Sequence, residues 1–213
     1  MGKVKLLSSC VALVGDVVDS RSQDRLRLHE AMTAAVTAVN DTVAALDPLR
    51  PTVGDEVQGV YAGLGEALAA SYALRSGLLG HADVRFGLGG GEVSIVDAAL
   101  GIQDGSAWWL ARQALEWVED LSRQPGHASA RTAIRDQRPT SVAAADALAR
   151  LVDAQLAGLR DGARRSLAGL LRGLDNHEVA AAEKISASAN SQRIINNDLR
   201  PLADAIAALS QLP

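Results

Sequence analysis

Residues 84–96 form an apolar segment that is unusually rich in glycine, with Gly87, Gly89, Gly90 and Gly91 close together. Glycine is unfavourable inside a β-strand because it loses the most conformational entropy on folding and has no side chain to pack. Three adjacent glycines are costly in a strand unless another backbone or a ligand must come close to it. The segment therefore predicts a strand with a close neighbour.

The segments around this strand carry the periodicities of a mixed fold. Short apolar runs closed by turn residues indicate buried strands, and apolar positions spaced three or four residues apart indicate amphipathic helices. Pro48 and Pro51 are expected to end the first helix. In the order strand, helix, hairpin, helix, strand, helix, the predicted elements are residues 10–14, 25–46, 52–61, 65–79, 84–96 and 106–121.

This order predicts an α+β fold. A ferredoxin-like βαββαβ domain of the palm type has an antiparallel sheet that is covered on one face by two helices. We assign it to residues 1–125, with a boundary near residues 123–139. Residues 126–213 are expected to form an all-α module with a helix-turn-helix at about 175–196.

Composition excludes several classes of protein. One cysteine, Cys10, rules out an internal disulfide framework and a multi-cysteine metal cluster, and its place in a buried strand predicts a core residue. No apolar stretch is long enough to span a bilayer, and the N-terminal apolar run lacks a signal cleavage site, so we expect a cytoplasmic protein without a membrane partner. The net charge of −4 argues against a surface that coats nucleic acid.

Two aspartates are the strongest candidates for a functional site. Asp16 follows the first strand and Asp55 lies at the tip of the hairpin, which the predicted topology places beside that strand. Carboxylates at neighbouring strand ends suit Mg²⁺ or Mn²⁺, and Glu56 and Asp19 are possible further ligands. Gly-Asp is also a common turn sequence, so a purely structural role stays open.

Three motifs, at residues 14–20, 53–59 and 85–93, together resemble the SatD family of bacterial proteins. In order and spacing they are also similar to the palm-type catalytic domain of class III nucleotidyl cyclases. That resemblance implies that Asp16 and Asp55 are metal ligands assisted by the Val17 carbonyl, and that Arg112 stabilises charge on a phosphate. It also implies a nucleotide-binding set made of Val17, Gly54, Arg85, Gly87 and Gly91.

Two departures from the cyclase pattern bear on catalysis. The asparagine that assists the cyclase transition state falls on Trp108, and the base-selecting lysine falls on Pro51. Trp108 and Trp109 are candidates for stacking on a base or for ordinary packing. A Mg²⁺- or Mn²⁺-dependent nucleotidyltransferase and a domain that binds nucleotide without turnover both remain open.

The C-terminal segment 175–196 predicts two helices separated by a turn at residues 184–186. Polar residues on the second helix suit contact with double-stranded DNA, and SatD-like proteins often end in such a motif. The candidate DNA-binding residues are Ser188, Asn190, Ser191, Gln192 and Arg193. Residues 160–200 contain seven basic and five acidic side chains, a smaller positive excess than is usual in a DNA-binding domain. A helical packing or dimerisation module is therefore the alternative.

Three hypotheses follow for the whole chain. The first is a regulator in which a metal–nucleotide domain is coupled to a DNA-binding helix-turn-helix. The second is an enzyme of nucleotidyl transfer. The third is a non-enzymatic dimeric scaffold whose acidic residues no longer have a function. A homodimer is compatible with each of them, because cyclase-like domains build their sites between two copies.

Overall fold

The computed structural model describes residues 5–20, 24–52, 54–97 and 100–213. Val53, the first residue of the hairpin motif, lies outside this range. The described residues form a six-stranded sheet, and the predicted α+β class is confirmed. Its strands are β1 (Lys5–Val17), β2 (Asp47–Pro51), β3 (Glu56–Tyr61), β4 (Val84–Asp97), β5 (Ile102–Asp104) and β6 (Thr132–Asp136).

Four strands of the sheet have the order β2-β3-β1-β4, and every neighbouring pair is antiparallel. This is the strand order of a βαββαβ fold. Two further strands pair with β4: β5 runs antiparallel to it and β6 runs parallel. The sheet is therefore mixed, not purely antiparallel as the sequence predicts.

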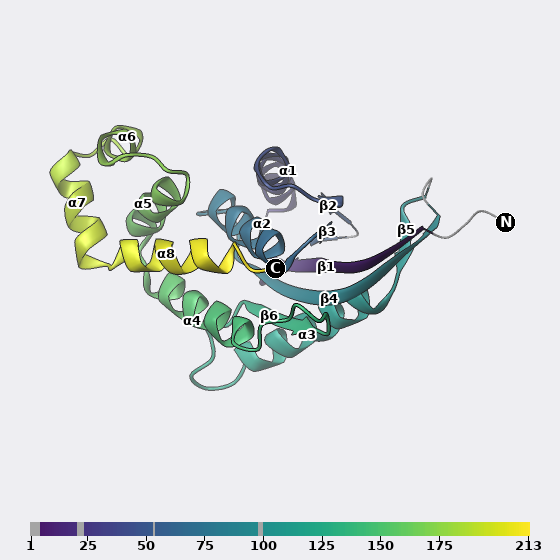
Figure 1. Cartoon of the computed structure of the whole chain (residues 1–213). Helices are drawn as coiled ribbons and strands as arrows, with labels where there is room; N and C mark the ends of the chain where they lie inside the picture. Colours follow the sequence, from purple (N-terminus) through teal and green to yellow (C-terminus); the bar gives the residue numbers. More distant parts are fainter. Residues whose placement is uncertain (1–4, 21–23, 53, 98–99) are drawn as a thin grey trace.

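Helices cover both faces of the sheet (Figure 1). Helices α1 (Arg25–Thr42) and α2 (Leu64–Gly77) lie on one face, and α3 (Ser106–Ser122) lies on the other. Strand β1 alternates between them: Val11 and Leu13 belong to the core under α1 and α2, whereas Ala12 and Val14 belong to the core under α3. Successive side chains of a strand point to opposite faces, so β1 is buried on both sides.

The two prolines of residues 47–51 have a role different from the predicted one. Helix α1 ends at Thr42, and Pro48 and Pro51 lie in β2, the strand at the edge of the sheet. Proline is tolerated at an edge because its missing N–H faces away from the ladder. The hairpin strands are consequently Asp47–Pro51 and Glu56–Tyr61, and the predicted first strand of the hairpin is placed several residues too late.

The predicted domain boundary at residue 125 cuts through the sheet domain. Strand β6 pairs with β4 from Phe86–Thr132 to Gly90–Asp136, and α4 (Ala145–Gly158) packs on β6. Strand β6 has only five residues, too few for its periodicity to be recognised in the sequence. Residues 126–213 are thus not entirely helical, and the helical part begins with α4.

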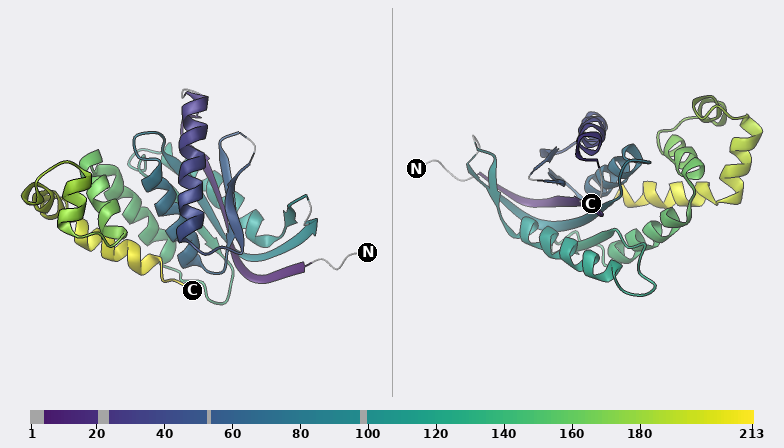
Figure 2. Two further views of the ribbon diagram at one scale, coloured as in Figure 1. Left: turned by 90° about the horizontal axis from the view of Figure 1, so that it is seen from above. Right: turned by 180° about the vertical axis from the view of Figure 1, so that it is seen from behind.

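The C-terminal helices pack against the sheet domain (Figure 2). They are α5 (Asp161–Leu171), α6 (Asn176–Ala182), α7 (Ala187–Asn196) and α8 (Leu199–Leu209). Leu199 and Ile206 of α8 share the apolar core of α1 and α2. The backbone N–H groups of Leu64 and Gly65, at the start of α2, donate to the carbonyls of Pro213 and Leu212 over 3.1 and 2.9 Å. These bonds cap a helix that has no side-chain cap.

None of the described helices is long and apolar enough to cross a membrane. The cytoplasmic location stays a prediction.

The glycines of β4 allow α3 to lie directly on the strand. A Cβ atom at Gly87 would meet the Ala111 carbonyl oxygen at 2.1 Å, and one at Gly89 would meet the Ala107 carbonyl oxygen at 2.1 Å. Real Cβ atoms do not approach a carbonyl oxygen so closely, and helix backbone cannot move aside cheaply. The close neighbour that the sequence predicts is therefore the backbone of α3.

We predict that Gly89→Ala lowers the free energy of unfolding by at least about 3 kcal/mol, because the added methyl group must push α3 off the sheet. Gly158→Ala is the matched control: this glycine is exposed near the end of α4, with no other atom within 4 Å of the added carbon. It should leave stability unchanged or raise it by up to about 1 kcal/mol. Urea unfolding monitored by circular dichroism measures both. Equal stability of the two variants would contradict the close approach of α3.

Candidate functional site

Three charged residues form a row across the ends of β3, β1 and β4. Asp16 is the register partner of Glu56 on β3 and of Arg85 on β4. Register partners in antiparallel strands point to the same face of a sheet, so all three side chains lie on the face that α3 covers. Two adjacent carboxylates would repel each other, and the basic residues around them remove that repulsion.

Arg85 neutralises Asp16 through two parallel hydrogen bonds. Its Nε and Nη2 atoms donate to Oδ1 and Oδ2 of Asp16 over 3.2 and 3.0 Å, and Nη2 also lies 3.6 Å from Oε1 of Glu119 on α3. Burial lowers the pKa of Arg85, but the hydrogen bonds and the charge of Asp16 outweigh burial and raise it. Both oxygens of Asp16 are therefore occupied by a permanent cation.

Arg112 neutralises Glu56 in the same way. It lies on α3, and its Nη1 and Nη2 atoms donate to Oε2 and Oε1 of Glu56 over 2.6 and 3.0 Å. Gln58 Nε2 donates to Oε1 over 2.6 Å. Burial raises the pKa of Glu56, but the bonds from Arg112 and Gln58 outweigh it, so the pKa lies below its ordinary value of 4.5.

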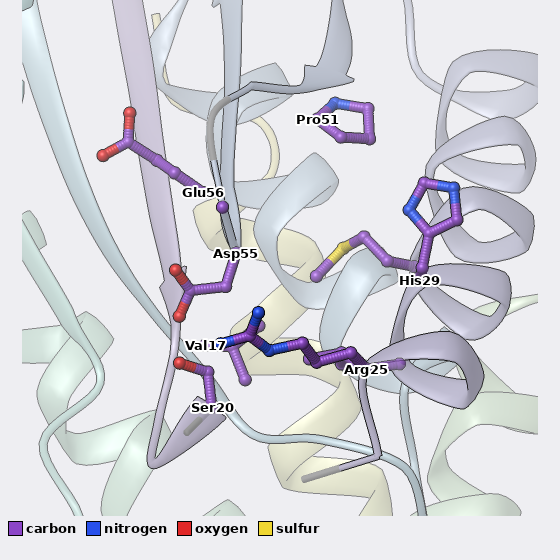
Figure 3. Close-up of a pocket in the computed structure, with 10 residues that line it drawn as sticks. Val17, Ser20, Arg25, His29, Pro51, Asp55 and Glu56 are labelled. Atoms are coloured by element: carbon purple, nitrogen blue, oxygen red, sulfur yellow. The ribbon is translucent and has the colours of Figure 1, made fainter. Parts of the chain in front are cut away.

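Asp55, in the turn that precedes β3, lines a cavity of about 340 Å³ between α1 and the β2–β3 hairpin (Figure 3). Its carboxylate points toward Val17 and Ser20, and Arg25 extends toward the same space from α1. Among the described residues, neither Asp55 nor Arg25 has an ion-pair partner within 4 Å. The cavity is lined by Val17, Ser20, Arg25, Leu28, His29, Met32, Pro51, Gly54, Asp55 and Glu56.

The described residues do not form a metal site of their own. No group of three or more His, Cys, Asp or Glu side chains gathers within the part of the chain that the structure describes. Asp16 is held by Arg85 and Glu56 by Arg112, which leaves Asp55 as the carboxylate facing the cavity without a cation. The arrangement fits a Mg²⁺ or Mn²⁺ ion that arrives already bound to a phosphate, because such ions often use only one or two protein carboxylates.

The predicted nucleotide-binding residues lie in two separate places. Val17 and Gly54 line the cavity, and Gly54 has a positive φ of 79° in the hairpin turn. Gly87 and Gly91 do not reach it: the space in front of Gly87 is filled by Ala111 and Leu115, and that of Gly91 by Ser106. The atoms in front of both glycines belong to α3, and a role of Gly87 and Gly91 in nucleotide binding stays a prediction.

The tryptophans and Pro51 differ in their surroundings. Trp108 is half-buried and donates from Nε1 to Gln103 Oε1 over 3.3 Å, whereas Trp109 is 61% exposed and donates to Asp104 Oδ1 over 2.9 Å. Both rings therefore have hydrogen-bond partners on or beside β5. Pro51 lines the cavity, at the position of the base-selecting lysine of the cyclase pattern.

Helices α6 and α7 occupy the segment predicted as a helix-turn-helix. Lys184, in the turn between them, has a φ of 55°, the left-handed conformation that glycine usually supplies there. Asp175 caps α6 with a reciprocal bond from Glu178, and Ser186 caps α7. The helices are present as predicted, and whether they bind DNA stays a prediction.

The candidate DNA-binding residues are not equally accessible. Ser188 and Gln192 are exposed and Ser191 is half-buried. Asn190 is fully buried, where it accepts a hydrogen bond from Ser166 Oγ over 2.7 Å and donates one to Asn176 Oδ1 over 2.9 Å. Its amide holds α7 against α5 and α6, so Asn190 could contact DNA only after leaving these hydrogen bonds.

Arg193 is also partly withdrawn from solvent. Its guanidinium lies against Gly162 of α5, and Nη1 is 3.4 Å from Oε2 of Glu183. The same carboxylate accepts a bond from Arg165 Nε over 2.7 Å. Arg193 must leave this ion-pair network before it can contact a phosphate.

The basic side of the cavity is not predicted from the sequence. Arg25 and His29 are one helical turn apart on α1, beside Leu28 and Met32, whose spacing suggested only a core-facing helix. The available signal was two basic side chains four residues apart on an otherwise apolar helix face. It is weak, because this pattern is common on surface helices.

The sequence matches the profile of the SatD family over residues 10–200, which is most of the chain. The chain belongs to the SatD family. Among proteins with curated descriptions, none is similar to it.

Several solved structures resemble the fold. One is the catalytic core of a rhodopsin-guanylyl cyclase with converted specificity in complex with ATPαS (TM-score 0.43, 14% identity, 55% of this chain and 76% of that chain). Another is the monomeric guanylyl cyclase domain of the RhoGC fusion protein of Blastocladiella emersonii (TM-score 0.41, 13% identity, 54% and 78%). A third is a bacterial light-regulated adenylyl cyclase (TM-score 0.42, 17% identity, 61% and 76%).

The lowered pKa of Glu56 predicts a pH-dependent contribution to stability. A carboxylate whose pKa falls on folding stabilises the protein above its unfolded pKa, and this contribution disappears as the pH falls through the folded value. Glu56→Gln should therefore be less stable than wild type at pH 7, by about 0.5–1 kcal/mol because Arg112 is partly exposed. The difference in the free energy of unfolding between the variant and wild type should disappear below about pH 4. Urea unfolding at a series of pH values measures it.

The partner variant provides the control. Arg112→Gln should also be less stable than wild type at pH 7, and this difference in the free energy of unfolding should disappear over the same pH range. The double variant should be little less stable than either single variant. Additive losses, or curves that stay parallel down to pH 3, would mean that the pair does not lower the pKa of Glu56.

Proposed function

We propose that this SatD-family protein is a regulator whose sheet domain binds a nucleotide in the cavity between α1 and the β2–β3 hairpin. One observation carries the proposal. The cavity beside Asp55 combines basic and polar donors, which have no partner within the described part of the chain, on one side with an apolar wall on the other. Nucleotides need both kinds of surface, because phosphates bind cations and hydrogen-bond donors while a base is largely apolar on its faces.

The lining residues divide according to this chemistry. Arg25 and His29 project from one side of α1 and, with the Ser20 hydroxyl, supply donors for phosphate oxygens. Leu28, Met32 and Pro51 supply flat apolar contacts for a base. A volume of about 340 Å³ lies at the lower end of the range for small-molecule sites.

The proposed cofactor is Mg²⁺ or Mn²⁺, brought in by the nucleotide. Asp55 would hold the metal from the protein side, with the Val17 carbonyl as a possible second ligand. When bound, the metal neutralises charge between the phosphates and Asp55. Asp16 is not part of this proposed set, because Arg85 occupies both of its carboxylate oxygens.

Isothermal titration with ATP and GTP, with and without Mn²⁺, tests the proposal. We expect saturable heat for at least one nucleotide and at least tenfold weaker binding in Arg25→Gln, because a charge-assisted bond to phosphate is worth about 1.5–3 kcal/mol. Asp55→Asn should abolish the gain in affinity that Mn²⁺ gives to wild type. Arg27→Gln is the matched control: Arg27 carries the same charge on the same helix but does not line the cavity.

Absence of heat with both nucleotides, or equal weakening in Arg25→Gln and Arg27→Gln, would contradict the proposal. The same samples address the alternative of a nucleotidyltransferase, which is favoured by Arg112, because it pairs with Glu56 and Glu56 lines the cavity. Chromatography after incubation should then reveal a product that Arg112→Gln and Asp55→Asn fail to form. If wild type forms no product, the site binds without turnover.

We propose that the C-terminal helices respond to nucleotide binding. Helix α8 shares the core of α1 and α2, and residues 212 and 213 cap the start of α2, so a shift of α1 or α2 would be transmitted to α8 by direct contact. Double-stranded DNA is the proposed partner of α7, through exposed Ser188 and Gln192. Ser191 and Arg193 would join them only after local rearrangement.

Fluorescence anisotropy on duplexes selected from a random library tests the DNA partner. We expect nucleotide to change the affinity for a selected duplex, and Gln192→Ala to weaken it about tenfold, as expected for loss of one contact to a base edge. Gln211→Ala, an exposed glutamine outside α7, is the control. If selected and random duplexes bind equally at moderate salt, α6 and α7 form a packing module.

We further propose a homodimer. Ile102 on β5 and Trp109 on α3 are 48% and 61% exposed, and a second copy would cover these apolar side chains.

A further inference from the structure

A second cavity, of about 360 Å³, lies between the sheet domain and the C-terminal helices. Its wall comes from the end of α2 and the loop after it, and from α4, α5 and α8. None of its lining residues lines the cavity beside Asp55. Its apolar side is formed by Leu79, Leu156, Leu167, Leu171 and Ile206.

Tyr72, one of the residues that line this cavity, carries an unsatisfied donor. Only 5% of Tyr72 is exposed, and among the described residues its hydroxyl has no hydrogen-bond partner. Buried hydroxyl groups are nearly always paired, because an unpaired one loses its bonds to water without replacement. Burial and the charge of Asp153 raise the pKa of Tyr72, so the hydroxyl keeps its proton and can donate a hydrogen bond to a ligand.

The charges around the cavity leave one cation in excess. Arg75 is paired with Asp153 over 2.5 Å, and Asp83 is paired with Arg131 over 2.6 Å. Arg164 has no carboxylate within 4 Å among the described residues. It donates instead to the carbonyls of Leu159 and Ala157 over 3.0 and 3.5 Å. A planar guanidinium without an acidic partner is a ready site for an anionic group.

We propose that this cavity binds a small organic anion with an apolar body, such as a medium-chain carboxylate. The carboxylate would accept hydrogen bonds from Arg164 and from the Tyr72 hydroxyl, and the hydrocarbon would lie on the leucine and isoleucine wall. Asp83 does not oppose the anion strongly, because Arg131 compensates its charge. Since α2 belongs to the sheet domain and α5 and α8 to the C-terminal module, the bound anion stabilises the contact between the two.

Octanoate is the probe, with 1-octanol and inorganic phosphate as matched ligands that lack the charge or the chain. In thermal unfolding of the full chain, octanoate should raise the midpoint in a concentration-dependent way below its micelle concentration, and neither matched ligand should do so. Isothermal titration should give at least tenfold weaker octanoate binding in Arg164→Gln and about fivefold weaker binding in Tyr72→Phe. Arg172→Gln, another arginine that donates only to a carbonyl, should bind like wild type.

Tyr72→Phe separates a ligand-binding role from a structural one. Because the hydroxyl has no partner, the ligand-free variant should unfold at the same or a higher temperature than wild type while it binds octanoate more weakly. The proposal is overturned if octanoate stabilises no more than octanol and phosphate do, or if Arg172→Gln weakens binding as much as Arg164→Gln. It is also overturned if Tyr72→Phe lowers the unfolding temperature and leaves octanoate binding unchanged.

Discussion

The contact between helix α3 and strand β4 is the constraint on which the rest of the structure depends. Glycines at 87 and 89 let the helix backbone lie on the strand, with Ala107 and Ala111 where side chains would otherwise stand. This close approach brings Arg112 within reach of Glu56 and Glu119 within reach of Arg85. If α3 lay farther from the sheet, Glu56 would lose Arg112 and would stand beside the carboxylate of Asp16 without a cation of its own.

The acidic residues at this end of the sheet differ in their surroundings. Asp16 and Glu56 are register partners and share the face of α3, whereas Asp55 lies in the turn before β3 and lines the cavity beside α1. The carboxylates of Asp16 and Glu56 are paired with arginines, whereas that of Asp55 has no ion-pair partner among the described residues. A pair of aspartates that looks equivalent in the sequence therefore has two roles: Asp16 holds strands together, and Asp55 faces a cavity.

The sequence predicts the parts of this arrangement that depend on local patterns. The βαββα order and the long helices follow from apolar periodicity, and the glycines of β4 correctly indicate a close neighbour. Periodicity does not say whether that neighbour is a helix or a ligand, and in the structure the atoms in front of Gly87 and Gly91 belong to α3. Strand β6 was missed because five residues carry too little pattern, and burial of Asn190 depends on Ser166 and Asn176, which meet it only in the folded chain.

A crystal structure grown with ATP and MnCl₂, with manganese located from its anomalous signal, tests the central claim most directly. The account predicts nucleotide density between α1 and the hairpin, with phosphates at Arg25 and His29, and any manganese bound to phosphate and Asp55. The two bonds from Arg85 to Asp16 should remain. Manganese held between Asp16 and Asp55 with Arg85 displaced, or a nucleotide bound elsewhere, would contradict it.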